Sequence, residues 1–184
     1  MKVRTGFVSN SSSTAFMFVY KNESIEELCQ LIEKYDQYFN LYSELEENES
    51  YKCTARQVAS AIEEELSDNN EDIFCKTKKM SLDKYIKDIQ DMLDKNVEQI
   101  KEYQKEGKQY KDYNWLTDYI YQNSQDLYKL QNLKKQGFTQ IVIANFGDND
   151  GPWRGTDLGR IMDYEGRYIY INKPDFVVWT EQNR

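Results

Sequence analysis

The polar run from Ser9 to Thr14 is the first stretch whose residue types could do chemistry. Backbone N–H groups of a serine-rich loop can hold a phosphate, and an activated serine hydroxyl can act as a nucleophile. Phosphate-binding loops also contain spaced glycines and a lysine that enters a helix, whereas a single glycine precedes this run and a strand-like segment follows it. We therefore expect a structural turn whose side chains hydrogen-bond to their own backbone.

Two carboxylates, Asp148 and Asp150, form the second candidate, in the segment GDNDGPWRG. Clustered carboxylates can hold Mg²⁺ or Ca²⁺. A calcium loop that starts at Asp148 needs glycine at its sixth and glutamate at its twelfth position, where this chain has Trp153 and Gly159. Calcium is therefore excluded, and the Asn-Asp-Gly triplet is also common in ordinary turns.

These two groups together define an alternative function. The chain would be a small-ligand or phosphate-binding protein, including a metal-dependent hydrolase, with its site between the serine turn and the aspartate loop. The residues of that site are Ser9, Ser11, Ser12, Ser13, Asp148 and Asp150.

No histidine occurs in the chain of 184 residues. Serine–histidine and cysteine–histidine pairs, histidine acid–base catalysis and histidine metal sites are therefore excluded. The cysteines, Cys29, Cys53 and Cys75, are widely spaced, which favours a reduced protein over a disulfide framework or a zinc site. No apolar stretch reaches the roughly 18 residues of a membrane span. We expect a protein without enzymatic activity, without a cofactor and without membrane association.

Negative charge is concentrated in one region. The net charge is −8, and residues 23–72 contain 15 acidic residues against Lys34, Lys52 and Arg56. Such a region repels nucleic acid and attracts basic surfaces. An ordinary solvated helix face is the competing interpretation. The acidic residues that we expect to face a partner are Glu44, Glu46, Glu47, Glu49, Glu63, Glu64, Glu65, Glu71 and Asp72.

Aromatic residues offer a second means of binding. Trp153 and Arg154 are neighbours in a loop-like segment, and both residue types are enriched at interface hot spots. The chain also has 15 tyrosines, more than a core of this size needs. We expect part of the tyrosines to contact a partner, since tyrosine provides contact area at a low cost in entropy.

Strand-like segments lie at both ends of the chain, with helical patterns between them. We expect strands at residues 3–8, 15–20, 138–146, 167–172 and 176–180, a turn at 147–155, and capping boxes at Ser24–Glu27 and Thr54–Gln57. The helix after Ser24 is expected to continue to Tyr42, with a polar break at residues 44–50 and a charged loop at 67–72. The predicted fold class is α+β, with an antiparallel sheet built from both termini and packed by helices.

A helical hairpin is predicted as an insertion in this body. From Ser81 and from Leu116, apolar residues recur three and four apart, and Asn96 and Asn123 interrupt the two patterns at facing positions. This predicts an antiparallel coiled coil with a paired asparagine in its seam, Leu93 opposite Leu127 and Tyr103 opposite Leu116. The predicted arm covers residues 81–136, with Gly137 as its cap, and the body covers 1–80 and 137–184.

The stretch GFVSNSSSTAF, from Gly6 to Phe16, is similar to an N-terminal signature, approximately FVSNSSSSSF, of small proteins from low-GC Gram-positive bacteria and their phages. Thr14 and Ala15 depart from the serine run, and the match covers under a tenth of the chain. The resemblance implies a mobile-element setting and carries over no catalytic residue. Some anti-CRISPR proteins that act on Cas9-type nucleases are similar in size and acidity.

The expected function is therefore that of a phage or mobile-element inhibitor, cytoplasmic in the host cell. It would bind a basic, nucleic-acid-handling host defence protein, with a Cas9-type effector as the leading candidate. Such an effector holds its guide and target in a positively charged channel, which suits an acidic protein. We expect no direct binding to nucleic acid, because phosphates would meet carboxylates.

Overall fold

The computed structural model describes residues 13–44, 50–67, 77–147 and 156–182. The chain divides into two compact units. Residues 1–80 and 140–184 form one unit, which we call the body, and residues 81–139 form the other, which we call the hairpin unit. The predicted strand at residues 3–8, and all of the predicted turn at 147–155 except its first residue, lie outside the described residues.

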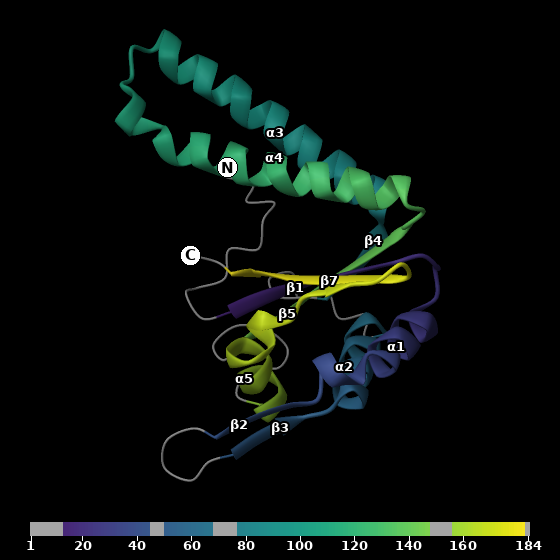
Figure 1. The fold of residues 1–184 in the computed structure, drawn as a ribbon. Coiled ribbons are helices and arrows are strands. Elements are labelled where there is room, and N and C mark those ends of the chain that lie inside the picture. The colour runs from purple at the N-terminus through teal and green to yellow at the C-terminus, as the bar shows by residue number, and fades with distance from the viewer. Residues whose placement is uncertain (1–12, 45–49, 68–76, 148–155, 183–184) are drawn as a thin grey trace. The chain divides into compact units, whose positions relative to one another are not determined.

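The body is built on a five-stranded sheet with the order β4-β5-β1-β7-β6. Its central strands are β1 (Ser13–Tyr20), β5 (Gln140–Gly147) and β7 (Phe176–Gln182), with β4 (Lys78–Ser81) and β6 (Ile171–Asn172) at the edges. β1 pairs antiparallel with both of its neighbours, so that Phe18 lies opposite Val142 on one side and Val178 on the other. A strand from the N-terminal part of the chain and one from its C-terminal part thus pair in one sheet, as the sequence pattern predicts (Figure 1).

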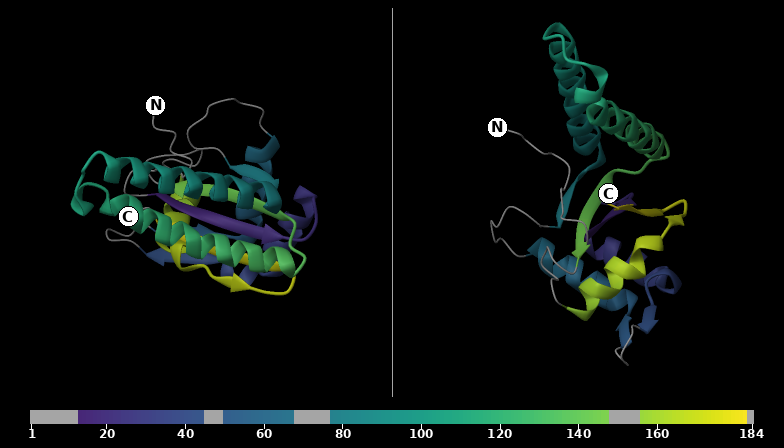
Figure 2. Two further views of the ribbon diagram at one scale, coloured as in Figure 1. Left: turned by 90° about the horizontal axis from the view of Figure 1, so that it is seen from above. Right: turned by 90° about the vertical axis from the view of Figure 1, so that its left-hand side faces the viewer.

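Three helices, α1 (Ile25–Lys34), α2 (Ala55–Ser67) and α5 (Asp157–Tyr164), lie on the same face of this sheet (Figures 1 and 2). Both predicted caps are present. The Ser24 hydroxyl accepts a hydrogen bond from the backbone N–H of Glu27 at 3.0 Å. Thr54 and Gln57 satisfy each other's backbone N–H groups, at 2.8 Å for Thr54 N to Gln57 Oε1 and 3.3 Å for Gln57 N to Thr54 Oγ1. The caps therefore determine where α1 and α2 begin.

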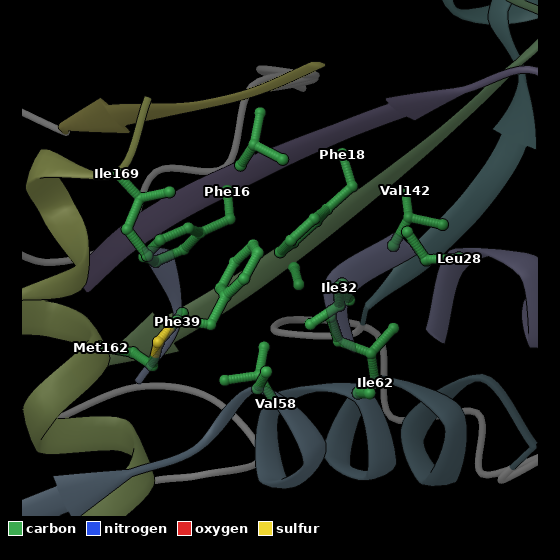
Figure 3. Close-up of a cluster of buried hydrophobic side chains, with 14 of the residues drawn as sticks. Phe16, Phe18, Leu28, Ile32, Phe39, Val58, Ile62, Val142, Met162 and Ile169 are labelled. Atoms are coloured by element: carbon green, nitrogen blue, oxygen red, sulfur yellow. The ribbon is translucent and has the colours of Figure 1, made fainter. Parts of the chain in front are cut away.

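The core lies between this sheet face and the three helices (Figure 3). Phe16 and Phe18 of β1 point into it, where they meet Ile32 of α1 and Val58 of α2. The intervening side chains of β1, Met17 and Val19, are buried as well. The unbroken apolar run from Ala15 to Tyr20 in β1, as opposed to apolar residues at every second position, is thus explained by burial of both faces of the strand.

The segment after α1 differs from the prediction. The helix ends at Lys34, a 3-10 turn η1 (Asp36–Tyr38) follows, and the chain continues as a two-stranded ribbon of β2 (Leu41–Glu44) and β3 (Ser50–Cys53). The helix predicted to continue to Tyr42 is therefore wrong. Aromatic residues around Phe39 favour extended structure, and the Asn40 side chain accepts a hydrogen bond from the N–H of Ala55 at 3.0 Å instead of continuing the helix.

The third helix of the body was also not predicted. α5 begins at the N-cap Thr156, whose Oγ1 accepts from the N–H of Gly159 at 3.0 Å. It is followed by the 3-10 turn η3 (Gly166–Tyr168), so that Arg167 lies in this turn and only Ile171–Asn172 of the predicted strand pairs with β7. The pattern after residue 156 is too short and too interrupted by glycine to be read as a helix from sequence.

The hairpin unit consists of α3 (Leu82–Lys105) and α4 (Asn114–Lys135), joined through the 3-10 turn η2 (Tyr110–Asp112). The two helices run in opposite directions and pack together (Figure 1). Ser81 caps α3 by accepting from the N–H of Lys84. Gly137 ends α4 with φ = 87°, a left-handed conformation that favours glycine, so the predicted cap is confirmed.

The contacts between α3 and α4 depart from the predicted register. The Tyr119 hydroxyl lies 3.1 Å from Met92 Sδ, whereas the prediction places Leu127 beside Leu93. The rings of Tyr103 and Tyr113 lie near each other, with centroids 6.4 Å apart. No hydrogen bond joins Asn96 to Asn123 within the described part of the chain, because the Asn123 amide donates to the Tyr119 carbonyl of its own helix at 2.7 Å. The predicted seam residues Ile89, Leu93, Leu116 and Leu130 are buried, and tyrosines such as Tyr119 add contacts outside the regular spacing.

Candidate functional site

Two exposed carboxylates of α1 lie on one face of that helix. Glu26 and Glu33 are seven residues apart, and Cys29 lies between them on the same face. The face is placed by the Ser24 cap at one end and by the buried residues Leu28 and Ile32 on the opposite side. The pKa of Glu26 is lowered by a hydrogen bond from its own backbone and one from the Ser24 hydroxyl, and Lys79 lowers it further.

α2 adds a third carboxylate to this face. The Cys29 thiol donates to the carbonyl oxygen of Ala59 in α2, with Sγ and O 3.6 Å apart. Burial raises the pKa of Cys29 to about 11, and the charges of Glu63, Glu33 and Glu26 raise it in the same direction. The three carboxylates, two from α1 and one from α2, therefore lie near enough to the Cys29 thiol to act on its pKa. We call Glu26, Glu33 and Glu63 the α1–α2 acidic surface.

The charges of this surface are largely unneutralised. Among the described residues, neither Glu33 nor Glu63 forms a salt bridge, whereas Lys79 lowers the pKa of Glu26. Three like charges around a buried contact repel one another and add nothing to helix packing. They are available to an opposite charge from outside the protein.

The two remaining glutamates of the predicted α2 cluster point elsewhere. Glu64 lies in a shallow, open depression of about 470 Å³ together with Arg56, whose charge is opposite. The depression is otherwise lined by Thr54, Gln57, Ser60, Ala61, Thr156 and Leu158. Glu65 is half-buried. Of the three consecutive glutamates, only Glu63 therefore belongs to the α1–α2 acidic surface.

Sequence reasoning missed Glu26 and Glu33. The signal was present, since a capping box places residue 26 in the first turn of a helix and a separation of seven places residue 33 on the same face. The sequence prediction was instead based on the number of acidic residues in the region, which favours runs of consecutive glutamates. What sequence could not show is that Cys29, between them, contacts α2.

Most other predicted site residues lie outside the described residues. Glu44 and Ser13 are the last residue of β2 and the first residue of β1. The residues that lie outside are Ser9, Ser11, Ser12, Glu46, Glu47, Glu49, Glu71, Asp72, Asp148, Asp150, Trp153 and Arg154. Within the described ranges, no group of three or more acidic or cysteine side chains is arranged to hold a metal ion.

Among the tyrosines whose side chains the structure describes, some lie in the core and others lie at the surface. Tyr20 and Tyr113 are buried, and Tyr35 and Tyr119 are half-buried. The tyrosines that are exposed on the hairpin unit are Tyr110, Tyr121 and Tyr128, and those exposed on the body are Tyr42, Tyr168 and Tyr170. Several rings carry a cation from their own chain, such as Lys52 at 5.1 Å from Tyr42 and Arg167 at 5.4 Å from Tyr168.

Net charge divides sharply between the two units. Residues 81–139 contain ten acidic and ten basic residues, so the body carries the whole net charge of −8.

Comparison of the chain with protein-family models, with curated proteins and with solved structures gives no match. None of the helices formed by the described residues has both the length and the apolar character of a membrane span.

Proposed function

We propose that this protein is a non-enzymatic inhibitor that binds a basic, nucleic-acid-handling host defence protein through the α1–α2 acidic surface. The observation that carries this proposal is the convergence of Glu26, Glu33 and Glu63 around Cys29, with Glu33 and Glu63 lacking salt bridges among the described residues. A stable fold does not need such an arrangement. Binding of a cationic surface would relieve the repulsion between the three charges.

The charge distribution supports an oriented approach to the partner. Because the hairpin unit is neutral and the body carries −8, a basic partner is attracted to the body. Attraction of this kind raises the association rate more than it lowers the dissociation rate. It also disfavours nucleic acid as the ligand, since phosphates would be repelled.

A Cas9-type nuclease is the target class that we propose. The similarity of Gly6–Phe16 to a signature of phage and Gram-positive bacterial proteins supports a counter-defence setting. Cas9-type nucleases present a positively charged channel for a guide–target duplex. An acidic protein that enters such a channel competes with the phosphate backbone for the same arginine and lysine side chains.

The test measures association of the full chain with an immobilised Cas9-type nuclease by surface plasmon resonance, from about 50 to about 500 mM salt. We expect the association rate to fall about tenfold or more over this range. The triple variant Glu26→Gln, Glu33→Gln and Glu63→Gln removes three charges at nearly constant volume, and it should slow association several-fold. Thermal unfolding checks that the variant still folds.

A matched control comes from α3. Asp88, Asp91 and Asp94 are exposed on the hairpin unit, and changing all three to Asn alters the net charge by the same amount. This control should associate at close to the wild-type rate. The proposal fails if the wild type does not bind the nuclease, if binding ignores both salt and the glutamate changes, or if the isolated protein binds DNA or RNA tightly.

A further inference from the structure

The outer face of α4 between Tyr121 and Tyr128 carries no charge. The exposed residues in this stretch are Tyr121, Gln122, Ser124, Gln125 and Tyr128. By contrast, most exposed residues of α3 are charged, among them Asp91, Lys95 and Glu98. Exposed helix faces normally carry charges, as α3 does, whereas the centres of protein interfaces are depleted of charge and enriched in tyrosine.

Tyr121 and Tyr128 stand out within this face. Their side chains are 66% and 67% exposed, which is about as exposed as any aromatic residue of the hairpin unit. Seven residues separate them, so both rings project from one side of α4, about 10 Å apart along the helix. Among the described residues, neither ring contacts another aromatic ring or a cation, unlike Tyr103, which has Lys108 Nζ 3.8 Å from its centroid.

We propose that this face of α4 binds the same face of a second copy of the chain, in an antiparallel pair. The two-fold axis would pass between Ser124 and Gln125, midway between the tyrosines. Tyr121 of each copy would then lie opposite Tyr128 of the other copy, so the same contact would occur twice. Such a repeated, self-complementary contact is characteristic of two-fold dimers.

The residues at the centre of the face suit this arrangement. Ser124 is small enough to let two helices approach closely, and its hydroxyl already donates to the Ile120 carbonyl at 2.7 Å, so burial leaves no donor unpaired. Gln125 lies next to its own counterpart across the axis. A side-chain amide has both a donor and an acceptor, so two of them can pair with each other.

Charge favours a second copy over other occupants. A basic or acidic partner would have to bury its charges against a face that offers no counter-charge, which is costly. The hairpin unit has ten acidic and ten basic residues, so two copies do not repel each other through it, while the acidic bodies would. The chain itself therefore supplies a face without exposed charge, on a unit of zero net charge, so two copies can bring these faces together without repulsion between their hairpin units.

The first test is sedimentation equilibrium of the full chain between about 1 and 200 µM, because an interface below the standard size dissociates in roughly the micromolar range. We expect a reversible monomer–dimer equilibrium. The variant Tyr121→Gln with Tyr128→Gln should weaken it at least tenfold. Tyr168→Gln, a change of a tyrosine on the body that is even more exposed, should leave the equilibrium unchanged.

The second test locates the axis. Oxidation of the Gln125→Cys variant should give a disulfide-linked dimer. Asp91→Cys, at an exposed position of α3, should not. The oxidised wild type is the control for the native cysteines. The proposal is overturned if the protein is monomeric at all concentrations or if the dimer survives the tyrosine changes in a folded variant. It is equally overturned if Tyr121 and Tyr128 are needed instead for binding a different protein. None of these outcomes bears on the α1–α2 acidic surface, so the two proposals fail separately.

Discussion

Tyr35, at the end of α1, donates its phenolic hydrogen to Asp175, which lies 140 residues further along the chain, with the hydroxyl oxygen 2.7 Å from Oδ1. Lys34 Nζ contacts the other carboxylate oxygen at 2.5 Å. Asp175 belongs to the turn between β6 and β7, and the Tyr35 ring stacks on Phe176 with centroids 5.9 Å apart. One carboxylate therefore ties the first helix of the body to its last hairpin.

Removal of this hydrogen bond should lower stability in a pH-dependent way. Partial burial acts to raise the pKa of Asp175, but the hydrogen bonds from Lys34 and Tyr35 outweigh it, so the pKa lies below its ordinary value. A lowered pKa in the folded state means that the contribution is complete above the unfolded value of about 3.9 and is lost as pH falls through the folded value. Tyr35→Phe should therefore cost about 1 kcal/mol at pH 7, measured by urea unfolding.

The same variant provides the pH check. As pH falls below the lowered pKa of Asp175 and its carboxylate is protonated, wild type and Tyr35→Phe should differ progressively less in free energy of unfolding than at pH 7. Asp175→Asn should show the same loss at pH 7 and little further change with acid. An equal effect of Tyr35→Phe at both pH values would show that the ring packing, and not the carboxylate, is what the change disturbs.

Removal of the hydroxyl of a second tyrosine, Tyr20, should not lower the free energy of unfolding. The Tyr20 ring is fully buried, and its hydroxyl has no hydrogen-bond partner among the described residues. Burial raises the pKa of Tyr20, and the charges of Glu27 and Cys29 raise it further, which keeps the phenol neutral. Tyr20→Phe removes an unsatisfied polar group, so it should leave the free energy of unfolding unchanged or raise it by up to about 1 kcal/mol. A loss of more than about 1 kcal/mol would reveal a partner for the hydroxyl.

The asparagines of the hairpin unit allow a test of the helix register. Asn96 and Asn123 are both half-buried, and the Asn123 amide is bound to Tyr119 of its own helix. We expect the changes Asn96→Leu and Asn123→Leu to be additive within about 0.5 kcal/mol, and the double variant to melt higher than the wild type. A double-mutant cycle by thermal unfolding measures this. A clearly larger coupling energy would mean that the two amides pair across the helices, as the spacing alone predicts.

Local features of the fold were accessible from sequence. The caps at Ser24 and Thr54 depend on contacts between residues three apart, and the left-handed Gly137 depends on a conformation that only glycine adopts easily. The apolar spacing from Leu82 onward predicted the existence of both hairpin helices for the same reason. Interactions of this kind join residues that are close in the sequence, so the order of the residues is enough to predict them.

The path of the chain after α1 depended on tertiary structure. Tyr38 continues the helical spacing, but burial of Phe39 and the hydrogen bond from Ala55 to Asn40 favour a turn and a ribbon at this point. The register of α3 against α4 was decided in the same way, by side chains such as Tyr119 and Met92 that only meet once both helices are in place.

The candidate site shows the same division. Sequence alone determined that the region from Glu23 to Asp72 is strongly acidic and that histidine chemistry is absent. Which carboxylates share a surface was decided by packing, because the contact of Cys29 with Ala59 brings Glu63 of one helix to Glu26 and Glu33 of another. The net charge of a region follows from its composition alone. Which charged side chains lie close together depends on the distance between α1 and α2, and that distance is set by the packing of the core between them.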